Sequence, residues 1–173
     1  MNVTTMNATI RPERPGDENA IGEVTRQAFE SHPYSHQTEH FIIEALRKAG
    51  ALSVSLVAEQ AGQVVGHIAF SPALIEDGSS DWYGLGPVSV LPELQGKGIG
   101  RALMEQGLAK LRELGASGCI LVGDPALYTR FGFANTSALV LDGVPPEFFL
   151  SLSLGAASAR GKVKFHAAFD AKG

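Results

Sequence analysis

The stretch "LPELQGKGIGRALMEQGLAKL" (residues 91–111) joins a glycine-rich turn directly to a segment with helical spacing. Gly96, Gly98 and Gly100 occupy alternate positions at this junction. The run from Ile99 to Leu114 predicts a helix, because one face at 100° per residue is apolar. That face consists of Leu103, Met104, Leu108, Leu111 and Leu114. Three glycines before a helix indicate either an ordinary tight turn or the close approach of an anion.

The start of this helix has the properties of an anion site. The first backbone N–H groups of a helix lack intrahelical acceptors, and the helix dipole adds partial positive charge there. Glycine lets a phosphate come close to the backbone and permits a positive φ where the turn requires one. Lys97 and Arg101 add positive charge around the same turn. A strand-to-helix turn with solvated basic residues stays open as the alternative at this point.

Two common phosphate-binding motifs do not fit the turn. A Walker loop needs G-x-x-x-x-G-K-[ST], and no glycine here precedes a Lys-Ser or Lys-Thr pair. The Rossmann fingerprint G-x-G-x-x-G, started at Gly96, requires glycine where Arg101 stands. The pattern that does fit is Q-x-x-G-x-G, through Gln95, Gly98 and Gly100.

The rest of the chain predicts a mixed α/β fold. Residues 52–59 and 64–71 have the apolar patterns of strands and flank a short turn, so they should form an antiparallel hairpin. Strand 82–90, the helix and strand 118–122 should form a right-handed crossover with parallel strands. Gly84, Gly86 and Pro87 weaken strand 82–90 and are typical of a bulge or of strands that part. The other expected elements are strand 8–12, helices from Asp17 and over 41–50, a short helix at 124–132, and strands 138–141, 148–154 and 162–169.

Length and composition indicate a globular protein. A single domain is expected over residues 1–173, with a core at about 8–141 and C-terminal strands at about 142–170. The net charge of −4 gives no general attraction to nucleic acid or to an anionic membrane. No apolar run is long enough to span a membrane and no secretory signal is visible, so a cytoplasmic location is expected. Cys119, the single cysteine, lies in the apolar run "CILV" and should be buried and unreactive.

Through its Q-x-x-G-x-G pattern the sequence resembles the GNAT superfamily of acyl-CoA-dependent N-acetyltransferases, whose pyrophosphate-binding motif has this form. The resemblance extends through "GLGPVSVLPELQGKGIGRAL", "LVGDPALYTRFGF" and the closing "KFHAAFD". It implies an α/β fold with a mixed sheet, in which N-terminal antiparallel strands lead to a central parallel strand pair splayed around the acyl-CoA site. The segment Gly123-Asp124-Pro125 departs from the family, because an Asn often follows this strand in GNAT proteins.

The resemblance also implies the site residues, with acetyl-CoA as co-substrate. The backbone N–H groups of Val88 and Val90 would bind the pantetheine arm where strand 82–90 parts from its neighbour. The Val88 N–H would also stabilise the oxyanion that an attacking amine creates. Tyr128 would protonate the departing thiolate, although it could instead simply pack beside Phe131 and Phe133. The pyrophosphate would bind the N–H groups of Gln95, Gly96, Lys97, Gly98, Ile99, Gly100 and Arg101.

The group that removes a proton from the amine is left unassigned. The candidates are His67 within a strand, the polar connection that carries His32, His36 and His40, and the carboxylates Glu30, Glu39 and Asp81. Helical spacing of His36 and His40 could form a metal pair, but no third ligand is evident and no metal is expected.

Three functions stay open, and the first is favoured. The first is direct transfer of an acetyl group from acetyl-CoA to a primary amine, without an acyl-enzyme. The second is a non-catalytic acyl-CoA-binding or sensing module. The third is a nucleotide-phosphate binder unrelated to CoA, against which the two unmatched motifs argue. The sequence does not distinguish a small-molecule acceptor from a protein acceptor, nor a monomer from a homodimer.

Overall fold

The structure is a computed structural model that describes residues 3–5, 8–155 and 158–173. Among these residues, the main sheet has seven strands in the order β1-β2-β3-β4-β6-β7-β9, and a smaller sheet has three in the order β5-β10-β8. The main-sheet strands are β1 (Val3–Thr5), β2 (Ala8–Pro12), β3 (Val54–Gln60), β4 (Gln63–Pro72), β6 (Trp82–Val90), β7 (Gly118–Val122) and β9 (Phe149–Ser153). The smaller sheet consists of β5 (Leu74–Ile75), β8 (Leu139–Val140) and β10 (Gly161–Lys164).

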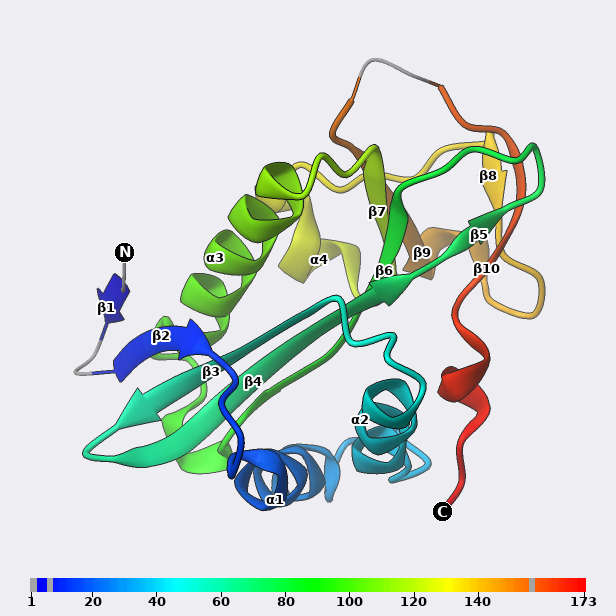
Figure 1. The fold of residues 1–173 in the computed structure, drawn as a ribbon. Helices are drawn as coiled ribbons and strands as arrows, with labels where there is room; N and C mark the ends of the chain where they lie inside the picture. Colours follow the sequence, from blue (N-terminus) through cyan, green and yellow to red (C-terminus); the bar gives the residue numbers. More distant parts are fainter. Residues whose placement is uncertain (1–2, 6–7, 156–157) are drawn as a thin grey trace.

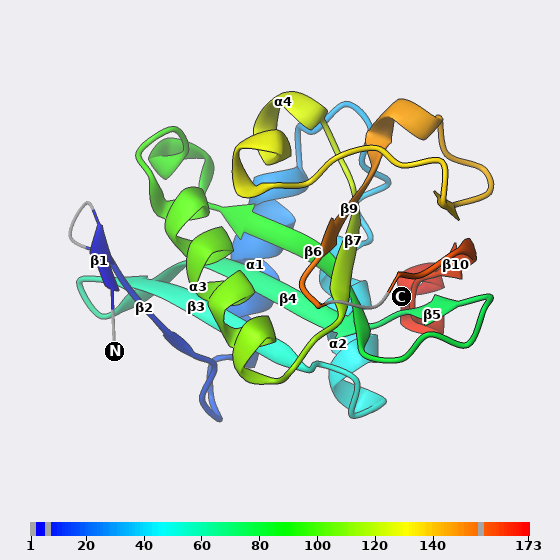
Figure 2. The ribbon, with the colours of Figure 1, turned by 90° about the horizontal axis from the view of Figure 1, so that it is seen from above.

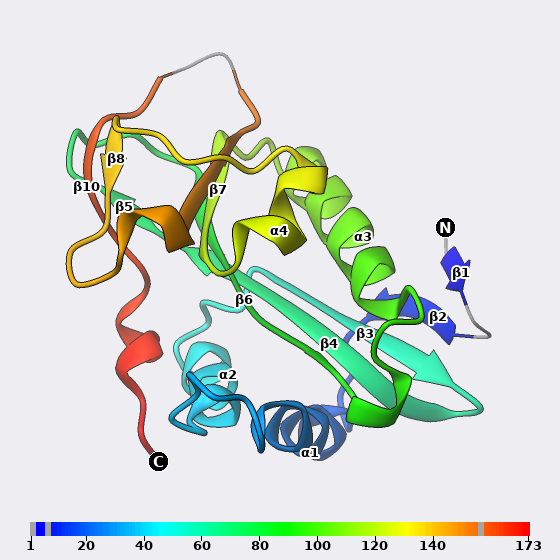
Figure 3. The ribbon, with the colours of Figure 1, turned by 180° about the vertical axis from the view of Figure 1, so that it is seen from behind.

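Helices cover both faces of the main sheet. The α-helices are α1 (Glu18–Phe29), α2 (Glu39–Lys48), α3 (Ile99–Glu113) and α4 (Pro125–Tyr128), and short 3₁₀ turns lie at Pro92–Leu94, Thr129–Phe131, Pro146–Phe148 and Ala167–Asp170. Figure 1 shows α3 on one face and α1 with α2 on the other. Seen from above, α3 crosses over β3 and β4 (Figure 2). The short helix α4 lies beside α3 on the same side of the sheet (Figure 3).

The largest core cluster fills the space between α3 and the sheet. Leu103 and Leu111 of α3 are fully buried against Ile68 and Phe70 of β4. Gly107 allows this close contact, because a Cβ atom there would lie 2.4 Å from Phe70 Cε1. The burial of these apolar side chains fixes α3, and with it the glycine-rich turn, over the middle of the sheet.

The strand pattern agrees with the sequence in its central part. β3 and β4 pair antiparallel, and β6 and β7 pair parallel around α3, so both predictions are confirmed. The predicted strand at 162–169 is wrong in its second half, because β10 ends at Lys164 and a 3₁₀ turn follows. Strands β1 and β5 were not predicted; each is only two or three residues long, too short for an apolar periodicity to appear.

Two predicted helix details also differ from the structure. Leu114, expected on the buried face of α3, is 55% exposed, because the helix ends at Glu113. Asp17 does occupy the N-cap position of α1, but its side chain makes no capping hydrogen bond. Its carboxylate instead accepts hydrogen bonds from the Arg11 guanidinium (2.8 Å) and the Arg14 N–H (2.7 Å). An ionic partner from β2 therefore outcompetes the local cap.

A chain of polar side chains lies on the α1/α2 face of the sheet. Ser55 Oγ donates a hydrogen bond to Glu13 Oε1 (2.6 Å), and Glu13 forms an ion pair with Arg47 of α2 (3.0 Å). Because the Ser55 proton is committed to Glu13, His67 Nε2 must donate to Ser55 Oγ across their 2.7 Å contact. His67 Nδ1 is then a bare lone pair, and no described residue donates to it. The arrangement holds His67 as a neutral imidazole.

This network predicts a pH-dependent stability. Burial lowers the pKa of His67 to about 4, from 6.5 in an exposed histidine. Between these pH values the unfolded chain binds the proton and the folded chain does not, so stability should fall as the pH falls from 6.5 towards 4. The full effect is on the order of 3 kcal/mol. Urea denaturation of wild type and His67→Gln across this range should show the fall in the wild type and a much smaller one in the variant.

Glu13 should not produce the same effect in this range. Burial raises the pKa of its carboxyl, but hydrogen bonds from Arg47 and Ser55 outweigh burial and leave the pKa below its usual value. A carboxylate of this kind keeps its full contribution above its unfolded pKa of about 4.5 and loses it only as the pH falls below that value. Identical pH profiles for wild type and His67→Gln would contradict the assignment of the effect to His67.

Candidate active site

β6 and β7 pair over only part of their length. The parallel pairs run from Trp82 opposite Gly118 to Gly84 opposite Ile120, and there they stop. Beyond that point β6 continues to Val90 bonded only to β4, while β7 continues to Val122 bonded only to β9. Among the described residues, no strand pairs with the β7-facing edge of β6 after Gly84. We call this edge, residues 85–90, the open edge.

A bulge at the start of the open edge gives the parting a physical cause. Leu85 lies opposite Phe70 and Val88 opposite Ile68, so β6 takes one more residue than β4 over this interval. The extra residue falls at Gly86–Pro87, and such a bulge bends its strand and increases the local twist. Gly84, Gly86 and Pro87, which the sequence analysis identified as unfavourable for a regular strand, therefore lie where the strands part, as predicted.

The backbone groups of the open edge alternate in direction. The N–H of Leu91 donates to the carbonyl of Val65 in β4 (2.9 Å). Alternate residues of an antiparallel ladder point to the partner strand, so Val88 and Val90 point their N–H and C=O groups away from β4. The Gln95 side chain confirms this direction, because its Nε2 donates to the Val90 carbonyl (3.0 Å). The N–H groups of Val88 and Val90 then face the open edge, where no described strand pairs with them.

The glycine-rich turn follows directly and ends at the first turn of α3. Gly96 and Gly98 have φ values of +75° and +94°, a region that favours glycine, and Gly98 is the N-cap of α3. No side chain caps this helix. The Gln95 N–H makes a long contact with the Pro92 carbonyl (3.4 Å), but within the described chain no acceptor faces the N–H groups of residues 96–101. These groups form the unpaired, electropositive helix start that the sequence predicted.

Gly100 is a glycine that the protein's own structure does not require. Its φ is not in the left-handed region, and a Cβ atom there would lie 3.8 Å from Val90 Cγ2, an ordinary contact. In contrast, Gly107, seven residues further along α3, must be glycine because a Cβ atom there would collide with the Phe70 ring. The free space at Gly100 lies at the helix start and against the open edge, where a ligand would use it.

The two basic residues of the turn lie at the surface. Lys97 is exposed and forms no ion pair with any described residue. Arg101 pairs with Glu105 one turn along α3 (2.9 Å), and both side chains are more than half exposed. An exposed pair of this kind contributes little, so the guanidinium is free to turn towards a more strongly charged anion.

Tyr128 lies at the end of α4, close to the point where β7 ends. Its ring packs edge-on to Phe133 (6.4 Å between centroids) and over Gly123, while its hydroxyl makes no hydrogen bond to any described residue. Burial raises the pKa of the Tyr128 hydroxyl, and the Asp124 carboxylate raises it further. The hydroxyl is therefore protonated at neutral pH and is able to donate.

The segment that departs from the family pattern positions this tyrosine. A Cβ atom on Gly123 would lie 2.5 Å from Tyr128 Cε2, so only glycine leaves room for the ring. Asp124 is the N-cap of α4, and its side chain accepts a hydrogen bond from the Ala126 N–H (2.9 Å). Sequence reasoning did not find this role, because a Gly-Asp-Pro segment is also typical of an ordinary helix start.

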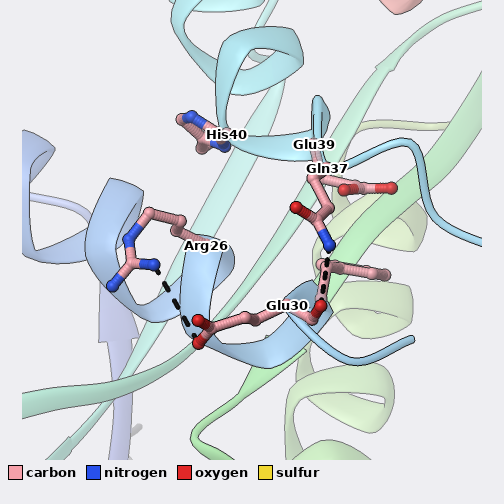
Figure 4. A pocket seen from close by; sticks show the side chains of 6 residues that line it. Arg26, Glu30, Gln37, Glu39 and His40 are labelled. Atoms are coloured by element: carbon pink, nitrogen blue, oxygen red, sulfur yellow. Dashed lines mark hydrogen bonds and ion pairs between the residues drawn. The ribbon is translucent and has the colours of Figure 1, made fainter.

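A cavity of about 200 Å³ lies between the end of α1 and the start of α2 (Figure 4). Gln37 spans it with a hydrogen bond from Nε2 to the Glu30 carbonyl (2.7 Å), and Arg26 pairs with the Glu30 side chain at 4.0 Å. Its lining residues are Arg26, Phe29, Glu30, Gln37, Glu39 and His40. The hydroxyl of Ser89 on the open edge donates to Thr25 of α1 (3.3 Å), so this end of α1 lies beneath the open edge.

Five of the seven unassigned base candidates fall in three places. Glu30, Glu39 and His40 line the cavity at the end of α1, whereas Asp81 lines a separate cavity of about 370 Å³ near the start of β6. His67 is buried beneath α1. α2 begins only at Glu39, so His36 and His40 do not share a helix face. In the described part of the chain no three His, Cys, Asp or Glu side chains are placed to hold a metal ion.

Cys119 is fully buried in β7, and burial raises the pKa of its thiol. The prediction that it is buried is confirmed, and a thiol in this state is not a nucleophile.

Val122 and Leu127, which were not singled out from the sequence, are large apolar side chains about half exposed at the end of β7 and on α4. Which apolar side chains stay exposed becomes visible only in the three-dimensional structure.

Comparison with known proteins identifies the family. Residues 20–133 match the Acetyltransferase (GNAT) family. A crystal structure of a GNAT family acetyltransferase from Brucella melitensis in complex with acetyl-CoA is 51% identical, with a TM-score of 0.84 over 94% of this chain and 98% of that one. The structure of YhbS from Escherichia coli in complex with CoA is 32% identical, with a TM-score of 0.87 over 100% of this chain and 97% of that one.

The curated sequence of the "uncharacterized N-acetyltransferase YhbS" of Escherichia coli K12 is 39% identical over 125 residues, which is 72% of each chain. None of the helices in the described ranges is long and apolar enough to cross a membrane. The expected mixed sheet, with its antiparallel N-terminal strands and its parted parallel pair, is the GNAT fold. The chain belongs to the acetyltransferase (GNAT) family.

Proposed function

We propose that this protein transfers the acetyl group of acetyl-CoA to a primary amine by direct attack, without an acyl-enzyme. The single observation that carries the proposal is the open edge, which presents the N–H groups of Val88 and Val90 beside an uncapped helix start. The related structures from Brucella melitensis and Escherichia coli, bound to acetyl-CoA and CoA, support the same ligand here.

The carrier would bind along the open edge. The pyrophosphate lies against the N–H groups of residues 96–101, with Lys97 and Arg101 as charge partners. The pantetheine arm extends alongside Val90 and Val88, taking the hydrogen bonds that a neighbouring strand would otherwise make. Gln95 contributes less as a direct ligand than the sequence implied, since its side chain holds the Val90 carbonyl and its N–H faces Pro92.

The chemistry at the thioester would proceed in two stages. The amine nitrogen forms a bond to the carbonyl carbon, and the Val88 N–H stabilises the negative charge that develops on the oxygen. The C–S bond then breaks, and the sulfur takes a proton from the Tyr128 hydroxyl, which solvent restores. The nitrogen loses a proton to solvent or to a base, leaving the acetylated amine and free CoA.

Tyr128→Phe should lower the rate of acetyl transfer and leave the affinity for acetyl-CoA unchanged. The variant keeps the ring that packs over Gly123 and against Phe133, so the fold should be intact. A CoA thiolate leaves readily, since thiol pKa values lie near 8.5, and we expect a loss of roughly 10²-fold in kcat. Thiol release is measured across a panel of amines, and calorimetry gives the affinity.

The same measurement separates the transferase from a sensing module. A sensor would bind acetyl-CoA and release no thiol with any amine, peptide or protein in the panel. In that case Tyr128→Phe would have no functional effect, and the proposal of catalysis would be wrong while the carrier site would stand.

Gly100→Ala should weaken acetyl-CoA binding without weakening the fold. Apart from its chain neighbours and its own helix backbone, the nearest described atom to the added methyl group is Val90 Cγ2 at 3.8 Å, and alanine in a helix gains up to about 1 kcal/mol over glycine. The methyl group would, however, occupy space beside the pyrophosphate, and we expect an increase in Kd of about tenfold. Calorimetry with acetyl-CoA and thermal denaturation measure the two effects.

Gly107→Ala is the matched control on the same helix. Its Cβ atom would lie 2.4 Å from the Phe70 ring, so this variant should lose stability while the affinity of the folded fraction stays close to that of the wild type. Unchanged acetyl-CoA binding by Gly100→Ala would argue against a pyrophosphate at the start of α3.

A further inference from the structure

The C-terminal segment reaches the point where β6 and β7 part. After β10 pairs with β5, the chain runs past α2 to the C-terminus (Figure 1). On the way, Phe165 lies directly over Gly84: a Cβ atom on that glycine would be 2.5 Å from Phe165 Cδ1. Gly84 is the last residue of β6 that pairs with β7. The Phe165 ring therefore covers the end of the open edge at which β6 and β7 are still paired.

The ring lies on the face of the sheet opposite to α3. Leu85 packs into the core cluster that includes α3, and neighbouring strand residues point to opposite faces. The missing side chain of Gly84 would thus point towards the α1/α2 face, where Phe165 is found. Phe169 stacks on Phe165 (5.0 Å between centroids) and packs against the Ile42 and Leu46 cluster of α2. The C-terminal segment is therefore held on both sides of Phe165: β10 pairs with β5 before it, and Phe169 packs against α2 after it.

The acceptor amine should approach from this same face. If the thioester oxygen accepts the Val88 N–H, the carbonyl group lies close to the plane of the sheet. An amine attacks a carbonyl carbon from above or below the carbonyl plane. One of these two sides carries α3 and α4 (Figure 3), with Tyr128 at the end of α4. The other side is the α1/α2 face, with Phe165 at its edge.

An unmatched hydroxyl lies in the same corner. Ser71 is the cross-strand partner of Gly84, so the two positions face the same side of the sheet at close range. Ser71 is 0% exposed, and its Oγ has no hydrogen-bond partner among the described residues. Ser71 lies three residues along β4 from Ile68, the partner of Val88, a separation of roughly 10 Å. Its hydroxyl is therefore out of hydrogen-bond reach of an amine at a thioester held by Val88.

We propose that Phe165 forms the acceptor side of the site, where its ring limits the bulk next to the amine. The acceptor class is then a primary amine on an unhindered carbon, with bulky or branched groups next to the nitrogen excluded. This inference rests on the proposed function and adds a specificity-determining residue that lies outside the family-matched stretch, residues 20–133.

The test uses CoA derivatives that need no turnover and no known acceptor. The sulfur of CoA carries CH₂–C(O)–NH–R, with R as methyl, butyl or benzyl, and calorimetry gives the Kd of each compound and of CoA. The wild type should bind the methyl amide more tightly than the benzyl amide. Phe165→Ala should shift this ratio towards the benzyl amide by about tenfold or more, with the Kd for CoA unchanged.

Two further variants complete the design. Phe148→Ala removes an aromatic side chain that is 43% exposed in the same C-terminal region, and it should leave the ratio unchanged. Ser71→Ala should also leave the ratio unchanged, because Ser71 lies out of reach of the amine. If Phe165→Ala fails to fold, Phe165→Leu, which keeps an apolar side chain, is judged by the same ratio.

An identical ranking of the three amides in wild type and in the folded Phe165 variant would overturn the role of Phe165. If CoA itself does not bind the wild type, the proposed function fails and the inference fails with it. CoA binding with an unchanged ranking overturns only the inference.

Discussion

A backbone N–H group needs a hydrogen-bond partner, and β6 presents two of them where its neighbour has turned away. Val88 and Val90 point towards β7, but β7 stops pairing at Gly84 opposite Ile120. A strand edge inside a sheet is costly to leave open, and most proteins cover such edges. Here the carbonyl of Val90 is held by Gln95, while the N–H groups are left for a ligand.

The other parts of the site follow from this parted pair. The bulge at Gly86–Pro87 bends β6, and the strand then leads into the turn whose positive φ values start α3. The tight packing of Gly107 against Phe70 fixes α3 over the sheet, so the helix start has a defined position relative to the open edge. On the far side of the parting, Gly123 and Asp124 hold Tyr128. In the proposed mode of binding, backbone groups hold the carrier and few side chains take part.

Sequence reasoning named the residues of the proposed carrier half of the site and not those of the proposed acceptor half. Glycines and a Q-x-x-G-x-G spacing are local signals, because a turn and a helix start are made by neighbouring residues. The same is true of the weakened strand at Gly84, Gly86 and Pro87, which was predicted to part or to bulge and does both. Val88 and Val90 were named through the resemblance to GNAT proteins, and the register of β6 with β4 shows that their N–H groups face away from β4.

The acceptor half depends on contacts between distant parts of the chain. Phe165 lies 81 positions after Gly84, and the two meet only because β10 pairs with β5. The predicted strand 162–169 missed this turn, since its apolar residues do resemble a strand. Likewise, Asp17 has the residue type of a helix cap, but Arg11 on β2 binds its carboxylate. Tertiary contacts of this kind produce no periodic pattern in the sequence.

Amide hydrogen exchange at the open edge tests the account most directly. In the free protein the N–H groups of Val88 and Val90 should exchange fast, whereas that of Leu91, bonded to Val65, should be protected. Saturating CoA should slow exchange at Val88, at Val90 and through residues 96–101, and change Leu91 little. If CoA binds and these amides still exchange as in the free protein, the carrier does not lie along the open edge.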